Sequence, residues 1–156
     1  MSRTLLILAA AGGSLAMLLG AYYWQSQGYP PCPMCWWQRY PHFAAVGIGV
    51  LALLVRGPAF PALGALAALT TSGLGVLHTG VEKGWWVLQT ACTTATGGLG
   101  GMSGSDLLSV EGDRAVMCDQ VSWDYLGLSM ASWNALLSAG LVLIWLLAVR
   151  ASRRAA

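Results

Sequence analysis

Four long stretches of apolar residues divide the chain, and shorter polar stretches separate them. The apolar stretches cover residues 4–24, 36–55, 60–78 and 130–149. Each approaches the roughly 20 residues that a helix needs to cross the hydrocarbon core of a bilayer. Backbone groups in lipid must be hydrogen-bonded within their own segment, which favours helices. The pattern therefore predicts an all-α membrane protein, with four transmembrane helices in a single membrane domain over residues 1–156.

The first apolar stretch has an alternative interpretation as a cleaved signal peptide. Its apolar part is long for a signal peptide, and it runs into Tyr22 and Tyr23 without a clear cleavage site before them. These features favour a helix that the protein retains.

Small residues in the third stretch predict close helix packing. Gly73 and Gly75 occur in the segment "TSGLGVL". Such residues let two helices approach closely in lipid, where packing rather than the hydrophobic effect drives association.

The composition supports a membrane protein and argues against a nucleic-acid partner. The chain is 56% hydrophobic and 9% charged, whereas a soluble domain has about 25% charged residues. Its net charge is only +2, and it has no basic stripe or nucleic-acid-binding motif. The lipid bilayer is therefore the expected surrounding.

The positions of the arginines predict the topology. Arg3 precedes the first stretch, Arg56 lies between the second and third, and Arg150, Arg153 and Arg154 follow the end of the fourth. Four crossings place these positions on one side, which the positive-inside rule assigns to the cytoplasm, together with both termini. The loops at about 25–35 and 79–129 are then extracytoplasmic, and the second is long and contains all six acidic residues.

All four cysteines fall in these two outer loops. Cys32 and Cys35 belong to the first, and Cys92 and Cys118 belong to the second. In a bacterium the compartment would be the periplasm, where disulfides form and persist. The predicted location is therefore the bacterial inner membrane.

The segment "PPCPMCWWQRYPH" brings a cysteine pair to the start of a helix. Pro33 is suited to the first helical turn, which leaves Cys32 just outside the helix and Cys35 within its first turn. Unpaired N–H groups there stabilise a thiolate. Arg39 follows Cys35 by four residues and so shares its face. Arg39 is either an interfacial anchor or a bundle-facing group that holds a polar ligand or stabilises a thiolate, and its alignment with Cys35 favours the second.

A Cys-x-x-Cys pair has three interpretations by itself. It is half of a zinc site with Cys92 and Cys118, a static disulfide or a redox couple. A compartment that favours disulfides argues against a zinc-thiolate site. A ring this small adds little stability as a static bridge. The redox couple is therefore preferred, and no metal is expected.

His78 and Glu82 lie at helical i,i+4 spacing where the third stretch reaches the outer side. Spacing alone is equally compatible with a polar pair at the membrane interface. However, both should lie at the depth of Arg39. An Arg, His and Glu cluster beside a reactive cysteine, covered by Trp and Tyr, suits a flat molecule with carbonyl groups such as a membrane quinone. Arg39, His78 and Glu82 are the candidate cofactor-binding residues.

Several segments together resemble one known family. "CPMCWWQRYPH" is similar to the Cys-x-x-Cys-x-x-(Gln/Glu)-Arg segment of the disulfide bond formation protein B (DsbB) family. "CDQVSWDYLGLSMASWN" resembles the family's segment from the last cysteine into the fourth helix, and "LHTGVEKGWW" resembles its exit from the third. The resemblance covers four helices, both outer loops and all four cysteines.

The resemblance implies a quinone-dependent oxidase of a periplasmic, DsbA-like thioredoxin-fold protein. Cys32 and Cys35 match the quinone-linked pair, with Cys35 engaging the quinone and Arg39 beside it. Cys92 would be attacked by the partner, and Cys118 would then exchange with Cys32. Electrons would pass from the partner through Cys92/Cys118 and Cys32/Cys35 to ubiquinone or menaquinone.

Two departures and two rival interpretations accompany the resemblance. "WVLQTAC" lacks the proline that many members carry before the loop cysteine, and Pro33 stands between the active cysteines. One rival is a four-helix quinone enzyme of the vitamin K epoxide reductase type, but "QR" after the cysteine pair and "WDYLGL" favour DsbB. The other is a non-enzymatic membrane protein with structural disulfides.

Overall fold

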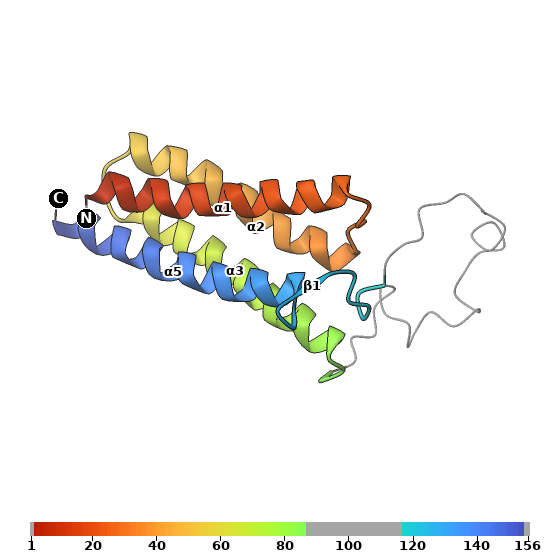
Figure 1. Cartoon of the computed structure of the whole chain (residues 1–156). Coiled ribbons are helices and arrows are strands. Elements are labelled where there is room, and N and C mark those ends of the chain that lie inside the picture. The colour runs from red at the N-terminus through yellow and green to blue at the C-terminus, as the bar shows by residue number, and fades with distance from the viewer. Residues whose placement is uncertain (1, 87–116, 155–156) are drawn as a thin grey trace.

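The computed structural model describes residues 2–86 and 117–154 and forms an elongated bundle of four helices (Figure 1). The helices are α1 (Arg3–Ser26), α2 (Pro33–Leu54), α3 (Ala59–Glu82) and α5 (Met130–Arg154). Neighbours pack in the cyclic order α1, α2, α3 and α5, so that α2 and α5 lie diagonally opposite each other, as do α1 and α3. This arrangement confirms the predicted all-α, four-helix bundle.

A short hairpin leads into α5. Strands β1 (Asp124–Tyr125) and β2 (Leu128–Ser129) pair antiparallel. The two residues between them, Leu126 and Gly127, both have positive φ, at 55° and 74°. Two successive positive φ angles are typical of the tight turn whose twist matches paired strands. The hairpin thereby joins Cys118 to the first turn of α5 in a compact path.

Three of the four described helices have the length and composition of membrane segments. Among the described residues, α1, α3 and α5 are long and apolar enough to cross a membrane. Helix α2 is more polar, because its first half includes Gln38, Arg39 and His42. Leucines on the outside of the bundle are well exposed, for example Leu54 at 75% and Leu143 at 64%. An outer surface of this kind suits contact with lipid rather than water.

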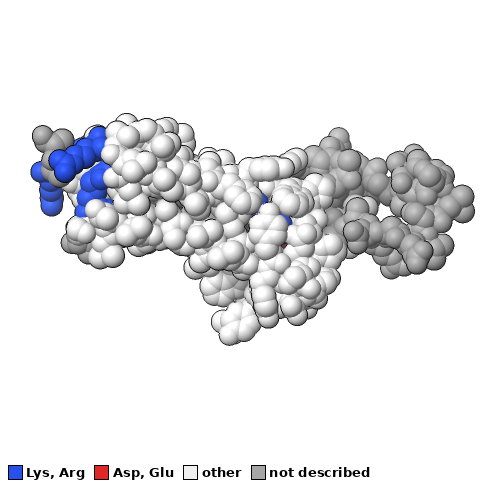
Figure 2. Space-filling model, turned by 90° about the horizontal axis from the view of Figure 1, so that it is seen from above, with Lys and Arg blue, Asp and Glu red and all other residues white. Residues whose placement is uncertain are grey.

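The two ends of the bundle differ in charge. Both chain termini and the α2–α3 turn lie at one end (Figure 1). Figure 2 shows Lys and Arg gathered over that end, while the visible middle of the bundle is uncharged. The opposite end, where α2 begins and α3 ends, carries the first cysteine pair.

Close packing at glycines holds the helices together. Gly64 lies against the indole of Trp145, which is fully buried in the apolar core. A Cβ at Gly75 would lie 2.8 Å from the backbone nitrogen of Ala135, so α3 and α5 are nearly in backbone contact there. The prediction for Gly75 is therefore confirmed. The prediction for Gly73 is wrong, because no atom lies within 4 Å of its Cβ position.

Candidate functional site

The first cysteine pair lies at the start of α2. Cys32 is the N-cap residue, and its sulfur accepts a hydrogen bond from the backbone N–H of Cys35 at 3.2 Å. Pro33 occupies the first helical position, where a missing N–H costs nothing. Both residues are free thiols, and their sulfur atoms are 2.9 Å apart. A disulfide bond is about 2.05 Å long, so only a small movement separates this dithiol from a disulfide.

Cys118 is buried next to this pair. Cys32, Met34, Val81 and Cys118 form one buried cluster, with Cys35 packed against it. Cys118 is fully buried and is disulfide-bonded. The predicted site residue Cys92 lies outside the described residues. The fold thus brings a residue of the second cysteine pair against the first pair.

Cys32 and Cys35 are not equivalent. The hydrogen bond with the Cys35 thiol, followed by burial, raises the pKa of the Cys32 thiol above its ordinary value. Cys32 precedes the helix and is almost fully buried, whereas Cys35 is partly exposed. In the reduced pair, Cys32 therefore keeps its proton, and Cys35 is the better placed thiolate.

His78 and Glu82 lie beside the cysteines on the last turns of α3. His78 Nε2 is 3.6 Å from the sulfur of Cys32 and 3.8 Å from Glu82 Oε1. The imidazole also hydrogen-bonds to the backbone of Cys118. Glu82 accepts a hydrogen bond from the Ser129 hydroxyl. His78 therefore contacts a residue from each cysteine pair.

Arg39 lies one turn below Cys35 and is 5% exposed. Its guanidinium donates a hydrogen bond to Gln25 Oε1 at 2.8 Å. The same group lies over the rings of Tyr22 and Trp36, at 4.7 and 4.6 Å from their centroids. A planar guanidinium suits this position, because it combines stacking on aromatic faces with several fixed donors. Arg39 is thus held within the bundle.

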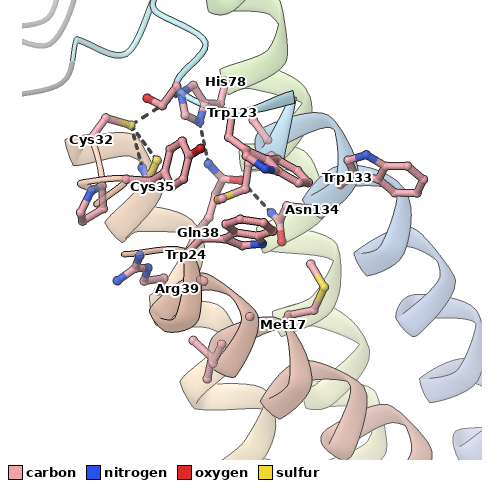
Figure 3. Close-up of a pocket in the computed structure, with 18 of the residues that line it drawn as sticks. Met17, Trp24, Cys32, Cys35, Gln38, Arg39, His78, Trp123, Trp133 and Asn134 are labelled. Carbon is pink, nitrogen blue, oxygen red and sulfur yellow. Dashed lines mark hydrogen bonds between the residues drawn. The ribbon is translucent and has the colours of Figure 1, made fainter. Parts of the chain in front are cut away.

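Sequence reasoning did not assign a role to three further polar residues, Gln38, His42 and Asn134. Gln38 Nε2 lies 2.8 Å from His78 Nδ1, and Asn134 Nδ2 donates to Gln38 Oε1 at 2.8 Å. His42 Nε2 lies 2.9 Å from Asn134 Oδ1. Figure 3 shows Gln38 between His78 and Asn134. The sequence alone could have pointed to Asn134, because a polar side chain within a mainly apolar membrane helix usually faces the bundle interior and has a specific role.

A cavity of about 420 Å³ opens beside these residues. Its wall is mainly apolar and includes aromatic side chains from α1, the α1–α2 loop, the hairpin and α5, namely Trp24, Tyr29, Trp123, Tyr125 and Trp133. Cys32, Cys35, Arg39, His78 and Glu82 also line it, so all predicted site residues in the described part of the chain except Cys118 meet at one cavity. His42 also lines the cavity, and its buried Nδ1 atom has no hydrogen-bond partner among the described residues.

The lining suits a flat, apolar molecule with carbonyl groups. Aromatic walls favour a planar ring, and Arg39 supplies charged donors to an oxygen atom. His42 supplies a second polar atom for a ligand or a water. Apolar pockets with a few converging polar groups are the usual form of small-molecule sites. The residues present therefore fit a quinone.

Cysteine and histidine are residue types that bind metal ions, but the hydrogen bonds of His78 differ from those of a metal-bound histidine. Three possible ligand atoms, one each from Cys32, Cys35 and His78, lie within 4.8 Å of one another. A metal-bound histidine usually donates from its other nitrogen to an acceptor. Here Gln38 presents its amide NH₂ to Nδ1 of His78. Nε2 then carries the proton, so it has no free lone pair for a metal.

A dithiol at the mouth of a membrane helix bundle, with Cys118 of the second cysteine pair packed against it, defines a thiol-redox membrane protein. The family model described as "Disulfide bond formation protein DsbB" matches residues 2–148. The chain therefore belongs to the DsbB family, as the segment resemblance predicted.

Curated relatives carry the same description. A disulfide bond formation protein B from Azoarcus sp. (strain BH72) is 34% identical over 94% of this chain and 93% of its own length. One from Aromatoleum aromaticum is 32% identical over 74% of this chain and 72% of its own. One from Xanthomonas oryzae pv. oryzae is 29% identical over 91% and 86%. No solved structure matches.

Proposed function

We propose that this chain is a thiol:quinone oxidoreductase that reoxidises a DsbA-like thioredoxin-fold protein and so sustains disulfide formation. The observation that carries the proposal is the position of Cys32. Its sulfur lies 2.9 Å from that of Cys35, which lines the cavity, and it shares a buried cluster with Cys118. Cys32 therefore packs with Cys118, lies beside Cys35 and shares the wall of the cavity with Cys35.

The proposed roles follow from this arrangement. Cys92 receives the attack of the partner's thiolate, and Cys118, once released, exchanges with Cys32. Cys35 is then released as the thiolate, which its place at the start of α2 stabilises. The partner's second thiol then displaces Cys92 and leaves the partner as a disulfide, and Cys92 attacks Cys118 and releases Cys32. Each exchange breaks one S–S bond and forms another, so that two electrons have moved from the partner to the Cys32/Cys35 pair.

Arg39, His78 and Glu82 are the proposed quinone-binding residues, with aromatic walls around them. A bound quinone, either ubiquinone or menaquinone, supplies the two-electron acceptor for the dithiol. Arg39 would hold a quinone oxygen through its charged donors. Trp24 and Trp123, whose ring centroids are 5.0 Å apart, exclude water from one side of the cavity.

The proposed topology places the cysteines in the periplasm and both termini in the cytoplasm of a bacterial inner membrane. The arginines at the terminal end of the bundle support this orientation through the positive-inside rule. The loops about 25–35 and 79–129 then meet the partner on the periplasmic side.

Replacement of Cys92 tests the proposed order of transfer. With Cys92→Ala, a reduced thioredoxin-fold partner stays reduced, while quinone still converts the Cys32/Cys35 dithiol to the disulfide. The measurement is thiol alkylation followed by mass spectrometry of purified chain and partner in detergent. Normal oxidation of the partner by the Cys92→Ala chain would contradict the proposed route.

A further inference from the structure

A line of buried hydrogen bonds runs from α2 to α5, back to α2 and then to α3. It runs from His42 Nε2 to Asn134 Oδ1, from Asn134 Nδ2 to Gln38 Oε1, and from Gln38 Nε2 to His78 Nδ1, with distances of 2.9, 2.8 and 2.8 Å. All four residues are less than 9% exposed. Because α2 and α5 lie diagonally opposite each other, the bonds of Asn134 to residues of α2 cross the middle of the bundle.

Backbone carbonyl groups determine which way both amides point. Gln38 Nε2 also donates to the carbonyl oxygen of Met34 at 3.2 Å, and Asn134 Nδ2 also donates to that of Thr71 at 3.2 Å. A carbonyl oxygen only accepts, so the NH₂ group of each amide must face it. Rotation of either amide by 180° would place two acceptors together in a buried position, which is costly.

The orientation of Gln38 in turn determines the tautomer of His78. An amide NH₂ is a donor only, so His78 Nδ1 must accept and cannot carry the proton. The proton of the neutral ring is therefore on Nε2. The groups that can accept the His78 N–H are the sulfur of Cys32 at 3.6 Å, Glu82 Oε1 at 3.8 Å and the backbone of Cys118. Each residue in this line therefore donates a hydrogen bond to the next, from His42 through Asn134, Gln38 and His78 to Cys32.

We propose that Gln38 and Asn134 are positioning residues that keep His78 in the Nε2–H tautomer, as a hydrogen-bond donor to the sulfur of Cys32. Neither residue lies in contact with Cys32, and each acts through His78. A donor at this position stabilises the thiolate of Cys32, the form in which its sulfur leaves Cys118 and then joins Cys35. This role in exchange rests on the proposed function, whereas the tautomer does not.

Nitrogen-15 NMR of the histidine-labelled full chain in detergent micelles tests the tautomer directly. The chain has two histidines, and the spectrum of a His78→Ala chain assigns the signals of His78. We expect a protonated Nε2 and an unprotonated Nδ1 at His78. A protonated Nδ1, whether alone or together with Nε2, would overturn the proposal. This test needs no variant of Gln38 or Asn134, and neither quinone nor a partner protein.

Two variants then test the positioning. Asn134→Leu and Gln38→Met remove the amides at similar volume. We expect His78 to become a mixture of both tautomers in Gln38→Met, and to contain a smaller share of the Nδ1–H form in Asn134→Leu, where the Met34 carbonyl still orients Gln38. Ser72→Ala is the matched control, because Ser72 donates to Ala135 between the same helices α3 and α5 but has no bond to this line. A pure Nε2–H form in both folded variants would overturn the proposal, as would an equal change in the control.

The reactivity of Cys32 provides the functional measurement. In a chain with Cys35→Ser, Cys92→Ser and Cys118→Ser, only Cys32 is left to react with N-ethylmaleimide at fixed pH. We expect His78→Ala to slow this reaction about tenfold, through loss of a hydrogen bond to a charged sulfur. Gln38→Met should slow it by a smaller factor, set by the fraction of His78 that stays Nε2–H, and Ser72→Ala should leave it unchanged. Equal rates in the parent chain and Gln38→Met would overturn the positioning role at Cys32. The assay uses no quinone, so its result is independent of quinone reduction.

Discussion

His78 Nε2 lies 3.6 Å from the sulfur of Cys32, although 46 positions separate the two residues in the chain. The imidazole is also hydrogen-bonded to the backbone of Cys118. It therefore stands where Cys118 meets Cys32. A donor so placed should favour exchange by stabilising charge on sulfur.

Replacement of His78 should slow exchange at Cys32. We expect His78→Ala to reduce the rate at which the partner's electrons reach the Cys32/Cys35 pair about tenfold, from the loss of a hydrogen bond to a charged group. Rapid acid quenching and alkylation measure this rate. Ser72→Ala, which removes a comparable buried hydrogen bond between α3 and α5, should have the parent rate. An unchanged rate in His78→Ala would show that His78 only fills space.

Arg39 should determine the affinity for quinone. We expect Arg39→Ala to raise the KM for quinone about ten- to a hundredfold, through loss of a charged hydrogen bond worth about 1.5–3 kcal/mol. Arg39→Lys should not restore the KM, because lysine lacks the planar group that lies between the rings of Tyr22 and Trp36. Steady-state kinetics and equilibrium quinone binding provide the measurements. If Arg39→Ala has the same KM and quinone affinity as the parent chain, Arg39 is an interfacial anchor and not a quinone-binding residue.

The sequence predicted those features that depend on local periodicity. Long apolar stretches are sufficient to predict the four helices, and i,i+4 spacing places Cys35 and Arg39 on one face of α2. The same spacing brings His78 and Glu82 to one face of α3, and all four residues line the cavity. Each of these predictions uses residues within one helix.

Features that depend on how the helices are rotated could not be predicted in this way. Gly73 and Gly75 are equivalent in composition, but only Gly75 faces α5. Asn134 lies in the first half of α5, and its partners Gln38 and Thr71 come from two other helices. Its role therefore becomes visible only when the diagonal arrangement of α2 and α5 is known.

The two thiols of the reduced pair should differ in their pH dependence. Because the Cys32 pKa is raised above its ordinary value of about 9, its thiolate fraction is small near neutral pH and continues to grow above pH 9. We expect alkylation of reduced chain at pH 7 to modify Cys35 first. The rate at Cys32 should still rise steeply between about pH 10 and 11, where an ordinary thiol has levelled off. Mass spectrometry of timed samples measures both rates. A rate at Cys32 that levels off below about pH 10 would contradict this assignment.

The α3–α5 contact should be sensitive to a single methyl group. An added Cβ at Gly75 would lie 2.8 Å from the backbone nitrogen of Ala135, so we expect Gly75→Ala to destabilise the chain by about 1–3 kcal/mol. Gly73→Ala is the matched control. Its Cβ meets open space, and alanine stabilises a helix by up to about 1 kcal/mol relative to glycine. Thermal unfolding in detergent compares them. Equal melting temperatures would contradict the close packing.

Thiol trapping in membranes that contain the chain and its reduced partner tests the central claim most directly. Cysteines are alkylated in membranes depleted of quinone and again after quinone is restored. The account predicts that the chain's cysteines accumulate as thiols without quinone, and that quinone returns them and then the partner to disulfides. Cysteines that stay oxidised without quinone, with the partner still reoxidised, would contradict it.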